Sequence, residues 1–212
     1  MEPLAPVFET VYNDYLARLQ GLDLAGIARQ WNLAFDGSRI SIPLLGRIYE
    51  AGLEGVTQTG QSPGPASRPP HLTCVTLFQY LLLNPKNPSP ASTWVCFRDF
   101  ADAAPFVGGF HDTVERRLAR DFAGSMDALL PAAMKLGAKP WAKDAPKCDA
   151  AFKIEALPGL WMAVAANDAD ESFPASGHVF FAQNAHEFLD MESLAMLGMI
   201  LVARLKNFNS AY

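Results

Sequence analysis

The chain has 212 residues, a formal net charge of −5, and apolar side chains at half of its positions. This apolar content excludes extended disorder, because such a chain can bury enough surface to fold. The acidic balance argues against a nucleic-acid-binding protein, since phosphate recognition needs a basic surface. Three cysteines in a chain of this length exclude a disulfide scaffold. We therefore expect one globular domain over residues 1–212.

The sequence carries no sign of export or membrane insertion. The N-terminus has neither the basic nor the apolar region of a signal peptide, and no stretch reaches the roughly 18 apolar residues that span a bilayer. Cys74, Cys96 and Cys148 form no C-x-x-C pair, so the chain encodes neither a structural zinc site nor an iron–sulfur cluster of its own. These features predict a cytoplasmic protein with reduced thiols.

Two helices are expected first. Apolar residues recur at steps of three and four from Leu4 to Leu19, and Gly21 then ends the pattern. A second, short helix is predicted over Asp23–Gln30. Short strands are expected next over Trp31–Phe35, Ser38–Leu44 and Gly46–Leu53.

Turn residues divide this first strand cluster. Asp36–Gly37 predicts a two-residue hairpin of type I′, a turn that needs positive φ at both positions. Pro43 either places its strand at a sheet edge or ends the strand early, because proline cannot donate to the ladder. The Gly-, Pro- and Ser-rich residues 57–70 predict a long loop, either a mobile spacer or a functional lid.

The central region is expected to be mainly helical. His71–Asn84 is apolar nearly all round, which predicts a helix buried on most sides. Trp94–Phe100 is expected to be a short extended segment, and Phe106–Phe110 a glycine-containing turn. Asp112 and Glu115 form a capping-box pattern that predicts the start of a new helix. That helix should run to about Phe122, and a further one should cover Met126–Leu136.

The last third predicts three strands and a final helix. Strands are expected over Phe152–Ala156, Leu160–Ala166 and His178–Ala182, after which Asp190 caps a helix over Met191–Leu205. Helices at both ends with strands between them predict an α+β fold. We expect a single domain in which about five or six helices pack on two clusters of mainly antiparallel strands. The pattern leaves open whether these clusters form two sheets or one.

Several segments occur in an order typical of one protein family. They are Gly46–Tyr49, Trp94–Phe100, Phe173–Ser176, Asn184–Leu189 and Glu192–Gly198. Together they resemble family 3786 of the domains of unknown function (DUF), which is found in anaerobic bacteria and archaea. The resemblance covers roughly Tyr12 to Leu205.

The resemblance implies a metabolic setting but no chemistry. The family has no assigned catalytic residues. Some relatives carry an iron–sulfur-binding segment in front of the domain, and some occur with anaerobic one-carbon and corrinoid metabolism. This chain starts directly with its first predicted helix and has no cysteine-rich segment. An iron–sulfur or corrinoid link would therefore come from a partner protein or a bound ligand.

The densest aromatic and charged stretch lies between Trp94 and His111. A ligand pocket needs apolar walls and a few polar groups that fix orientation. Arg98 can bind a carboxylate or phosphate through two hydrogen bonds, and His111 can serve as an acid, a base or an axial ligand of a tetrapyrrole. The alternative interpretation is that these aromatic residues form the edge of the protein core and bind no ligand. The candidate ligand-binding residues are Trp94, Arg98, Asp99, Phe106, Phe110, His111 and Phe173.

A cluster of carboxylates before the predicted strand over His178–Ala182 suggests a metal site. Such side chains can bind a hard cation or act as acid and base. His186–Asp190 is similar to the H-E-x-x-H motif, but an aspartate stands at the second histidine position. The alternative is a solvated loop whose carboxylates cap the backbone. The candidate metal ligands are Asp168, Asp170, Glu171 and His186.

Two functions from different classes follow. The first is a binding or accessory protein of anaerobic metabolism, whose ligand is a small molecule or a tetrapyrrole such as a corrinoid or haem. Its partner would be an iron–sulfur, corrinoid or methyl-transfer protein. The alternative is a metal-dependent hydrolase or transferase that uses the acidic and histidine residues of the last third. No standard nucleotide-binding or hydrolase motif occurs, so the sequence decides neither whether the chain is an enzyme nor which cofactor it binds. We expect neither a nucleic-acid nor a membrane partner, and a homodimer stays open.

Overall fold

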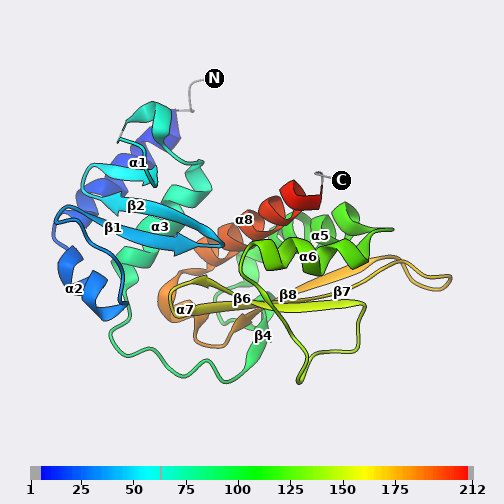
Figure 1. Cartoon of the computed structure of the whole chain (residues 1–212). Helices are drawn as coiled ribbons and strands as arrows, with labels where there is room; N and C mark the ends of the chain where they lie inside the picture. Colours follow the sequence, from blue (N-terminus) through cyan, green and yellow to red (C-terminus); the bar gives the residue numbers. More distant parts are fainter. Residues whose placement is uncertain (1–5, 63, 210–212) are drawn as a thin grey trace.

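Two separate antiparallel sheets form the framework of the computed structural model, which describes residues 6–62 and 64–209 (Figure 1). The smaller sheet has three strands in the order β1-β2-β3. The larger has five strands in the order β4-β8-β7-β6-β5. The α+β class is thereby confirmed, and the two strand clusters form two sheets rather than one.

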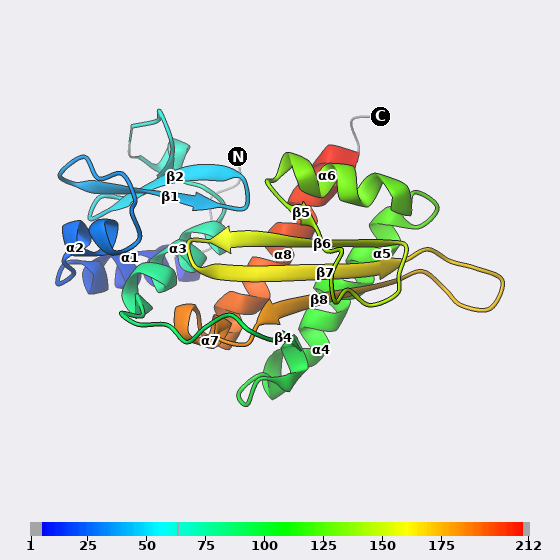
Figure 2. The same ribbon diagram turned by 60° about the horizontal axis from the view of Figure 1, so that its bottom comes forward.

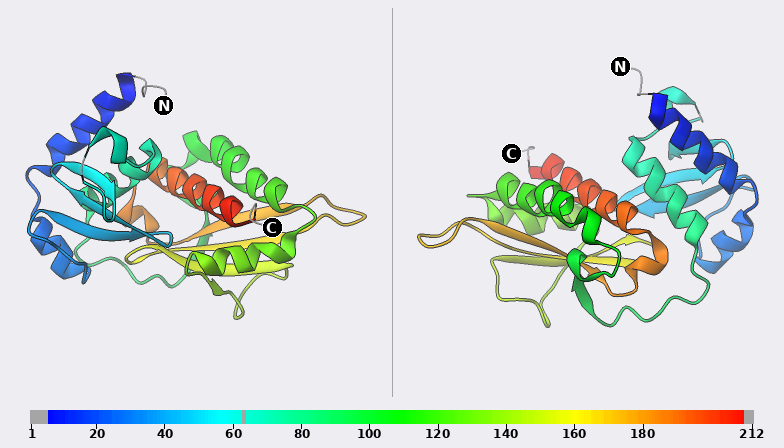
Figure 3. Two further views of the ribbon diagram at one scale, coloured as in Figure 1. Left: turned by 45° about the horizontal axis from the view of Figure 1, so that its top comes forward. Right: turned by 180° about the vertical axis from the view of Figure 1, so that it is seen from behind.

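The first part of the chain builds the small sheet and the helices beside it. Asp23 caps the second helix by accepting a hydrogen bond from the backbone nitrogen of Gly26 at 2.8 Å. The third helix packs against both the first and the last helix of the chain (Figure 3). The predicted start of the first helix at Leu4 lies outside the described residues. The elements are α1 (Pro6–Leu19), α2 (Leu24–Gln30), β1 (Arg39–Leu44), β2 (Arg47–Gly52), β3 (Gly55–Gln58) and α3 (His71–Leu83).

The predicted strand over Trp31–Phe35 does not form, and neither does the type I′ turn after it. Only Phe35 makes an isolated bridge with Ile40. The carboxylate of Asp36 accepts hydrogen bonds from the backbone nitrogens of Ser38 and Arg39, each at 2.8 Å. Of the two turn residues, only the glycine has positive φ. The side chain of the aspartate thus builds the turn that the prediction assigned to the backbone.

The prediction for Pro43 is confirmed, because β1 is an edge strand of the small sheet. The loop predicted over residues 57–70 begins later, since β3 extends to Gln58. The end of this loop is fastened to α1 by Arg68. Its Nη1 lies 2.6 Å from Oε1 of Glu9, and its guanidinium lies 3.8 Å from the ring centre of Tyr12.

The rest of the chain builds the large sheet and its helical layer. Figure 2 shows helices α5 and α8 behind the strands, so helices cover one face of this sheet. The strands are β4 (Trp94–Cys96), β5 (Lys139–Pro140), β6 (Ala150–Leu157), β7 (Leu160–Asn167) and β8 (Ser176–Ala182). The helices are α4 (Val107–Phe110), α5 (Arg116–Phe122), α6 (Leu129–Lys135), α7 (Ala185–Phe188) and α8 (Met191–Asn209).

The helix predicted to begin at Asp112 begins earlier. A 3-10 turn over Ala104–Phe106 leads into α4, and the π-helical turn η4 (His111–Glu115) joins α4 to α5. Phe106–Phe110 is therefore the start of this helix and not a separate turn. The capping box does not form, because the backbone nitrogens that it would satisfy lie inside a continuing helix.

The predicted cap of the last helix is confirmed. Asp190 accepts a hydrogen bond from the backbone nitrogen of Ser193 at 2.8 Å. In the segment before it, α7 forms a single helical turn. Within the described residues, no helix combines the length and the apolar character needed to cross a membrane.

The tip of the β1–β2 hairpin is buried and connects the two sheets. Leu44 and Leu45 are almost completely enclosed. The backbone nitrogen of Leu45 donates to the carbonyl of Ala156 on β6 at 2.9 Å. Arg204 of α8 donates to the carbonyls of Leu44 and Leu45 and, at 2.8 Å, to the hydroxyl of Tyr49. One buried guanidinium therefore ties the last helix to the first hairpin.

We predict that replacing Arg204 by methionine destabilises the protein strongly. Methionine fills much of the space but donates nothing, so buried carbonyls at the hairpin tip lose their partner. The loss in free energy of unfolding should be about 3 kcal/mol. Urea denaturation of Arg204→Met against the parent measures it. Arg47, an exposed arginine on the same hairpin, provides the control, and Arg47→Met should change stability by less than about 0.5 kcal/mol. Equal effects of the two variants would contradict this role.

We also predict a large difference between two glycine substitutions. Gly46 and Gly60 both have positive φ, at 77° and 83°. A Cβ on Gly46 would lie 2.9 Å from backbone atoms of Leu136, whereas a Cβ on Gly60 would meet nothing within 4 Å. Gly60→Ala should therefore cost about 1 kcal/mol. Gly46→Ala should cost about 3 kcal/mol, because it adds a backbone clash to the same strain. Thermal denaturation of both variants tests whether the hairpin tip is closely packed.

Candidate functional site

One edge of the large sheet is only partly covered by a strand. β4 pairs with residues 180–182 of β8, although β8 begins at Ser176. Beyond Cys96, where β4 ends, the π-helical turn η4 approaches the open edge. There the carboxylate of Glu115 accepts a hydrogen bond from the backbone nitrogen of Val179 at 3.3 Å. A side chain thus takes the place of a neighbouring strand and protects the edge.

The same carboxylate also faces two histidines. Its Oε2 lies 3.1 Å from Nδ1 of His111, and its Oε1 lies 3.7 Å from Nδ1 of His178. Only 17% of the Glu115 side chain is exposed, whereas more than half of each histidine side chain is in contact with solvent. His111 and Glu115 stand at the two ends of the π-helical turn, a conformation often found at functional sites. The arrangement is a buried carboxylate that orients two accessible imidazoles.

The electrostatics of this trio favour a charged pair. Burial by itself raises the pKa of Glu115, but the nearby imidazole of His178 and the hydrogen bonds from His111 and the nitrogen of Val179 outweigh it and leave the pKa below its ordinary value. The nearby carboxylate of Glu115 raises the pKa of His178 above the usual range, against the opposing effect of burial. The carboxylate is therefore ionised, and it stabilises the protonated form of the imidazole.

A cavity of about 210 Å³ opens next to this trio. Its lining combines apolar side chains with the two histidines and Arg98. Cys96 also reaches it, but burial and the nearby Asp99 raise the pKa of its thiol. The thiol is therefore protonated at neutral pH and is a poor nucleophile. The lining residues are Cys96, Phe97, Arg98, Val107, Phe110, His111, Glu115 and His178.

Comparison with known proteins identifies a family but no studied relative. Residues 23–204 match DUF3786, described as a domain of unknown function. The chain belongs to the DUF3786 family. The match confirms the resemblance found in the sequence, and it includes every residue that lines the cavity. No curated protein and no solved structure matches the chain.

Three of the seven candidate ligand-binding residues of this DUF3786 chain line the cavity, namely Arg98, Phe110 and His111. Asp99 instead lines a neighbouring cavity of about 240 Å³ that also contains His186. Phe106 is partly buried and packs against the hydrophobic core.

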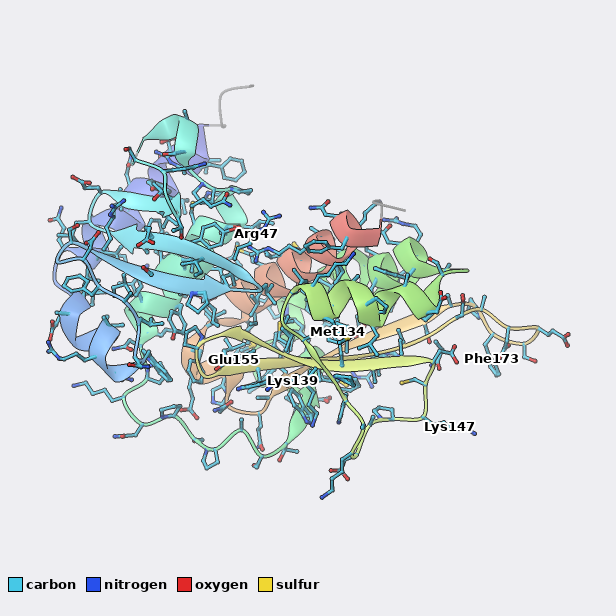
Figure 4. All side chains as sticks on the ribbon, in the orientation of Figure 1. Arg47, Met134, Lys139, Lys147, Glu155 and Phe173 are labelled. Atoms are coloured by element: carbon cyan, nitrogen blue, oxygen red, sulfur yellow. The ribbon has the colours of Figure 1, made fainter. Side chains whose placement is uncertain are left out.

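The other two candidates lie elsewhere. Trp94 lies on β4, where its ring packs against Trp141, with the ring centres 5.5 Å apart. Phe173 is 71% exposed on the loop between β7 and β8, which projects from one end of the molecule (Figure 4). The stretch from Trp94 to His111 therefore supplies six of the eight residues that line the cavity, and Glu115 and His178 supply the other two.

Two residues that complete the site were missed. Glu115 was interpreted as part of a capping box, and His178 was assigned only to a strand. Their sequence patterns are ordinary, since an acidic residue near a helix start and a polar residue on a half-exposed strand need no function. The one available signal was that His178 stands directly before an apolar segment, Val179 to Ala182.

The candidate metal ligands are engaged with the backbone. Oδ1 of Asp168 accepts from the nitrogens of Gly124 and Ala169, and these bonds lower the pKa of its carboxyl. Oδ1 of Asp170 accepts from the nitrogens of Ser172 and Phe173, each at 2.7 Å. The loop is thus built by side-chain caps, as in the alternative interpretation of the sequence.

His186, the remaining candidate metal ligand, is distant from this loop. Asp168 to Glu171 precede β8, whereas His186 follows it, so the seven residues of that strand separate them by about 20 Å. Nδ1 of His186 lies 3.0 Å from the carbonyl of Gln183. Among residues 6–62 and 64–209, no three His, Cys, Asp or Glu side chains are grouped so as to hold a metal ion.

We predict that the contribution of Glu115 to stability depends on pH. The raised pKa of His178 gives stability that is present below about pH 6.5 and is lost as the pH rises through the folded-state value. The lowered pKa of Glu115 gives stability that is present above about pH 4.5 and is lost as the pH falls. Glu115→Gln should therefore cost most, about 1 kcal/mol, between these values, and less toward about pH 9.

Denaturation of the parent and the variant across this pH range measures the difference. Asp112→Asn is the matched control, because Asp112 lies on the same π-helical turn but pairs with Arg116, whose charge is constant over the range. Its effect should not change above about pH 5.5. A cost of Glu115→Gln that stays level from about pH 5.5 to 9 would contradict the coupling to His178.

Proposed function

We propose that this DUF3786 chain is a binding protein whose ligand is a small organic molecule held between β4, β8 and the π-helical turn. The observation that supports the proposal is that the cavity lining combines apolar side chains with a few polar groups, the usual composition of a ligand site. Glu115 fixes the orientation of both histidines before any ligand arrives, which lowers the entropic cost of binding.

Binding is favoured over the alternative, a metal-dependent hydrolase or transferase. The residues proposed for that chemistry lie at the two ends of β8 and hold backbone groups. Within the cavity, Cys96 carries a protonated thiol and the carboxylate of Glu115 is committed to its three partners. These side chains are arranged to hold a molecule rather than to attack one.

A volume of about 210 Å³ suits a small molecule better than a tetrapyrrole, whose ring would have to lie across the mouth with His111 or His178 as its axial ligand. The family setting in anaerobic metabolism keeps that version within the proposal. An iron–sulfur, corrinoid or methyl-transfer partner and a homodimer stay predictions.

An NMR screen of small organic molecules tests the proposal. We expect molecules that bind the parent to perturb resonances of the cavity residues and to lose their effect in Val107→Trp, because the indole fills the space beside the partly buried Val107. Ile48→Trp adds the same indole at a half-exposed position on β2 and should leave binding unchanged. Circular dichroism and thermal denaturation establish that both variants fold.

Titration with haem and with a cobalamin, followed by absorbance, forms a second arm. A spectral shift that disappears in His178→Gln and His111→Gln supports the tetrapyrrole version. A screen in which no small molecule and neither tetrapyrrole perturbs the cavity would overturn the proposal. Binding that survives in Val107→Trp would place the ligand elsewhere on the protein and overturn it as well.

A further inference from the structure

We infer that the ligand of this cavity is a small carboxylic acid with an apolar body, bound as its anion. The inference rests on the proposed function and specifies the chemistry of the ligand. Phe97, Val107 and Phe110 would contact the body, while Arg98 and His178 would receive the carboxylate. The argument depends on which polar groups around the cavity already have partners.

Arg98 has hydrogen-bond donors to spare. Its ion-pair partner is Asp99, but Nε lies 3.9 Å from Oδ1, which is too far for a hydrogen bond. Asp99 instead accepts from the backbone nitrogen of Cys96 at 3.2 Å. Within the part of the chain that the structure describes, the guanidinium of Arg98 makes no hydrogen bond. It presents the planar fork of donors that matches a carboxylate.

The histidines add to this positive side. Both imidazoles direct Nδ1 toward Glu115, so Nε2 of each ring has no hydrogen bond to the described residues. Arg98 and His178 line the same cavity, and the charge of Arg98 opposes protonation of this imidazole. Glu115 thus faces the two histidines, while Arg98, whose ion-pair partner is Asp99, keeps its hydrogen-bond donors unused. An anion from solution would accept these unused hydrogen bonds.

The rest of the lining decides between kinds of anion. Phe97 and Phe110 are almost fully buried, and their stacked rings lie 4.3 Å apart behind the polar groups. With Val107 they form an apolar wall that offers no hydrogen bond to an inorganic phosphate. The apolar body of an organic acid would cover this wall and remove it from water. The guanidinium of Arg98 repels a cation. An organic carboxylate is therefore the class that satisfies both sides.

Benzoate and benzamide form a matched pair of probes, because they share a ring and differ in charge. We expect benzoate, titrated by NMR, to shift the ring protons of His178 and His111 and the backbone resonances around Phe97. Benzamide should bind at least about tenfold more weakly, since it lacks the charge that Arg98 pairs with. Inorganic phosphate at the same ionic strength should not compete with benzoate.

A second comparison locates the charge partner. Arg98→Gln should weaken benzoate binding about tenfold. Arg29→Gln is the control, because Arg29 matches Arg98 in exposure, at 76% against 74%, and in its distance of 3.9 Å from an aspartate. It lies on α2, outside the cavity, and its loss should leave benzoate binding unchanged. Neither variant removes a buried side chain, so both should fold.

Each contrary result has a distinct meaning. Equal binding of benzoate and benzamide would overturn the inference while leaving a binding pocket. Competition by phosphate would overturn the apolar carboxylate as the ligand class. If Arg98→Gln and Arg29→Gln weakened benzoate binding equally, benzoate would be an adventitious surface anion only, and the inference would be overturned. If benzoate fails while other molecules of the screen occupy the cavity, the inference falls and the proposed function stands. If nothing occupies it, both fall.

Discussion

Arg204 donates its hydrogen bonds to the tip of the β1–β2 hairpin, and the contact between the two sheets depends on this buried guanidinium. Its partners are carbonyl and hydroxyl oxygens, and burial lowers the pKa of the guanidinium. A charge in such a place is tolerated only when its donors are satisfied. The hairpin tip must therefore stay where α8 can reach it. The bond from Leu45 to Ala156 adds a backbone connection to the large sheet.

The candidate site follows from a mismatch of strand lengths in that sheet. β4 covers only part of β8, so the remaining backbone of β8 needs another partner. Glu115 supplies it, and the same carboxylate then holds two imidazoles beside a cavity. The π-helical turn that completes the edge of the sheet thus also places the carboxylate of Glu115 next to the cavity. This double use explains why Glu115 is partly buried although it carries a charge.

The secondary structure was largely predictable because its signals are local. The apolar run from His71 predicted a buried helix, and nine consecutive residues of α3 are indeed buried. The predicted strands over Phe152–Ala156, Leu160–Ala166 and His178–Ala182 correspond to β6, β7 and β8, and Asp190 located the start of α8. The errors arose where one residue pattern is compatible with two different local structures. Asp36 fitted a hairpin turn but caps the backbone itself, and Asp112 fitted a helix start but lies within a longer helix.

The sequence by itself determined the fold class, most helices and strands, the family, and part of the cavity lining through Arg98, Phe110 and His111. These features depend on residues close together in the chain, where periodicity and turn chemistry act. Only the tertiary structure decided that Glu115 and His178 meet, that Phe173 and Asp168 lie elsewhere, and that Arg204 reaches the first hairpin. Such contacts join residues from distant segments, and no local pattern records them because they arise from how the two sheets and their helices pack.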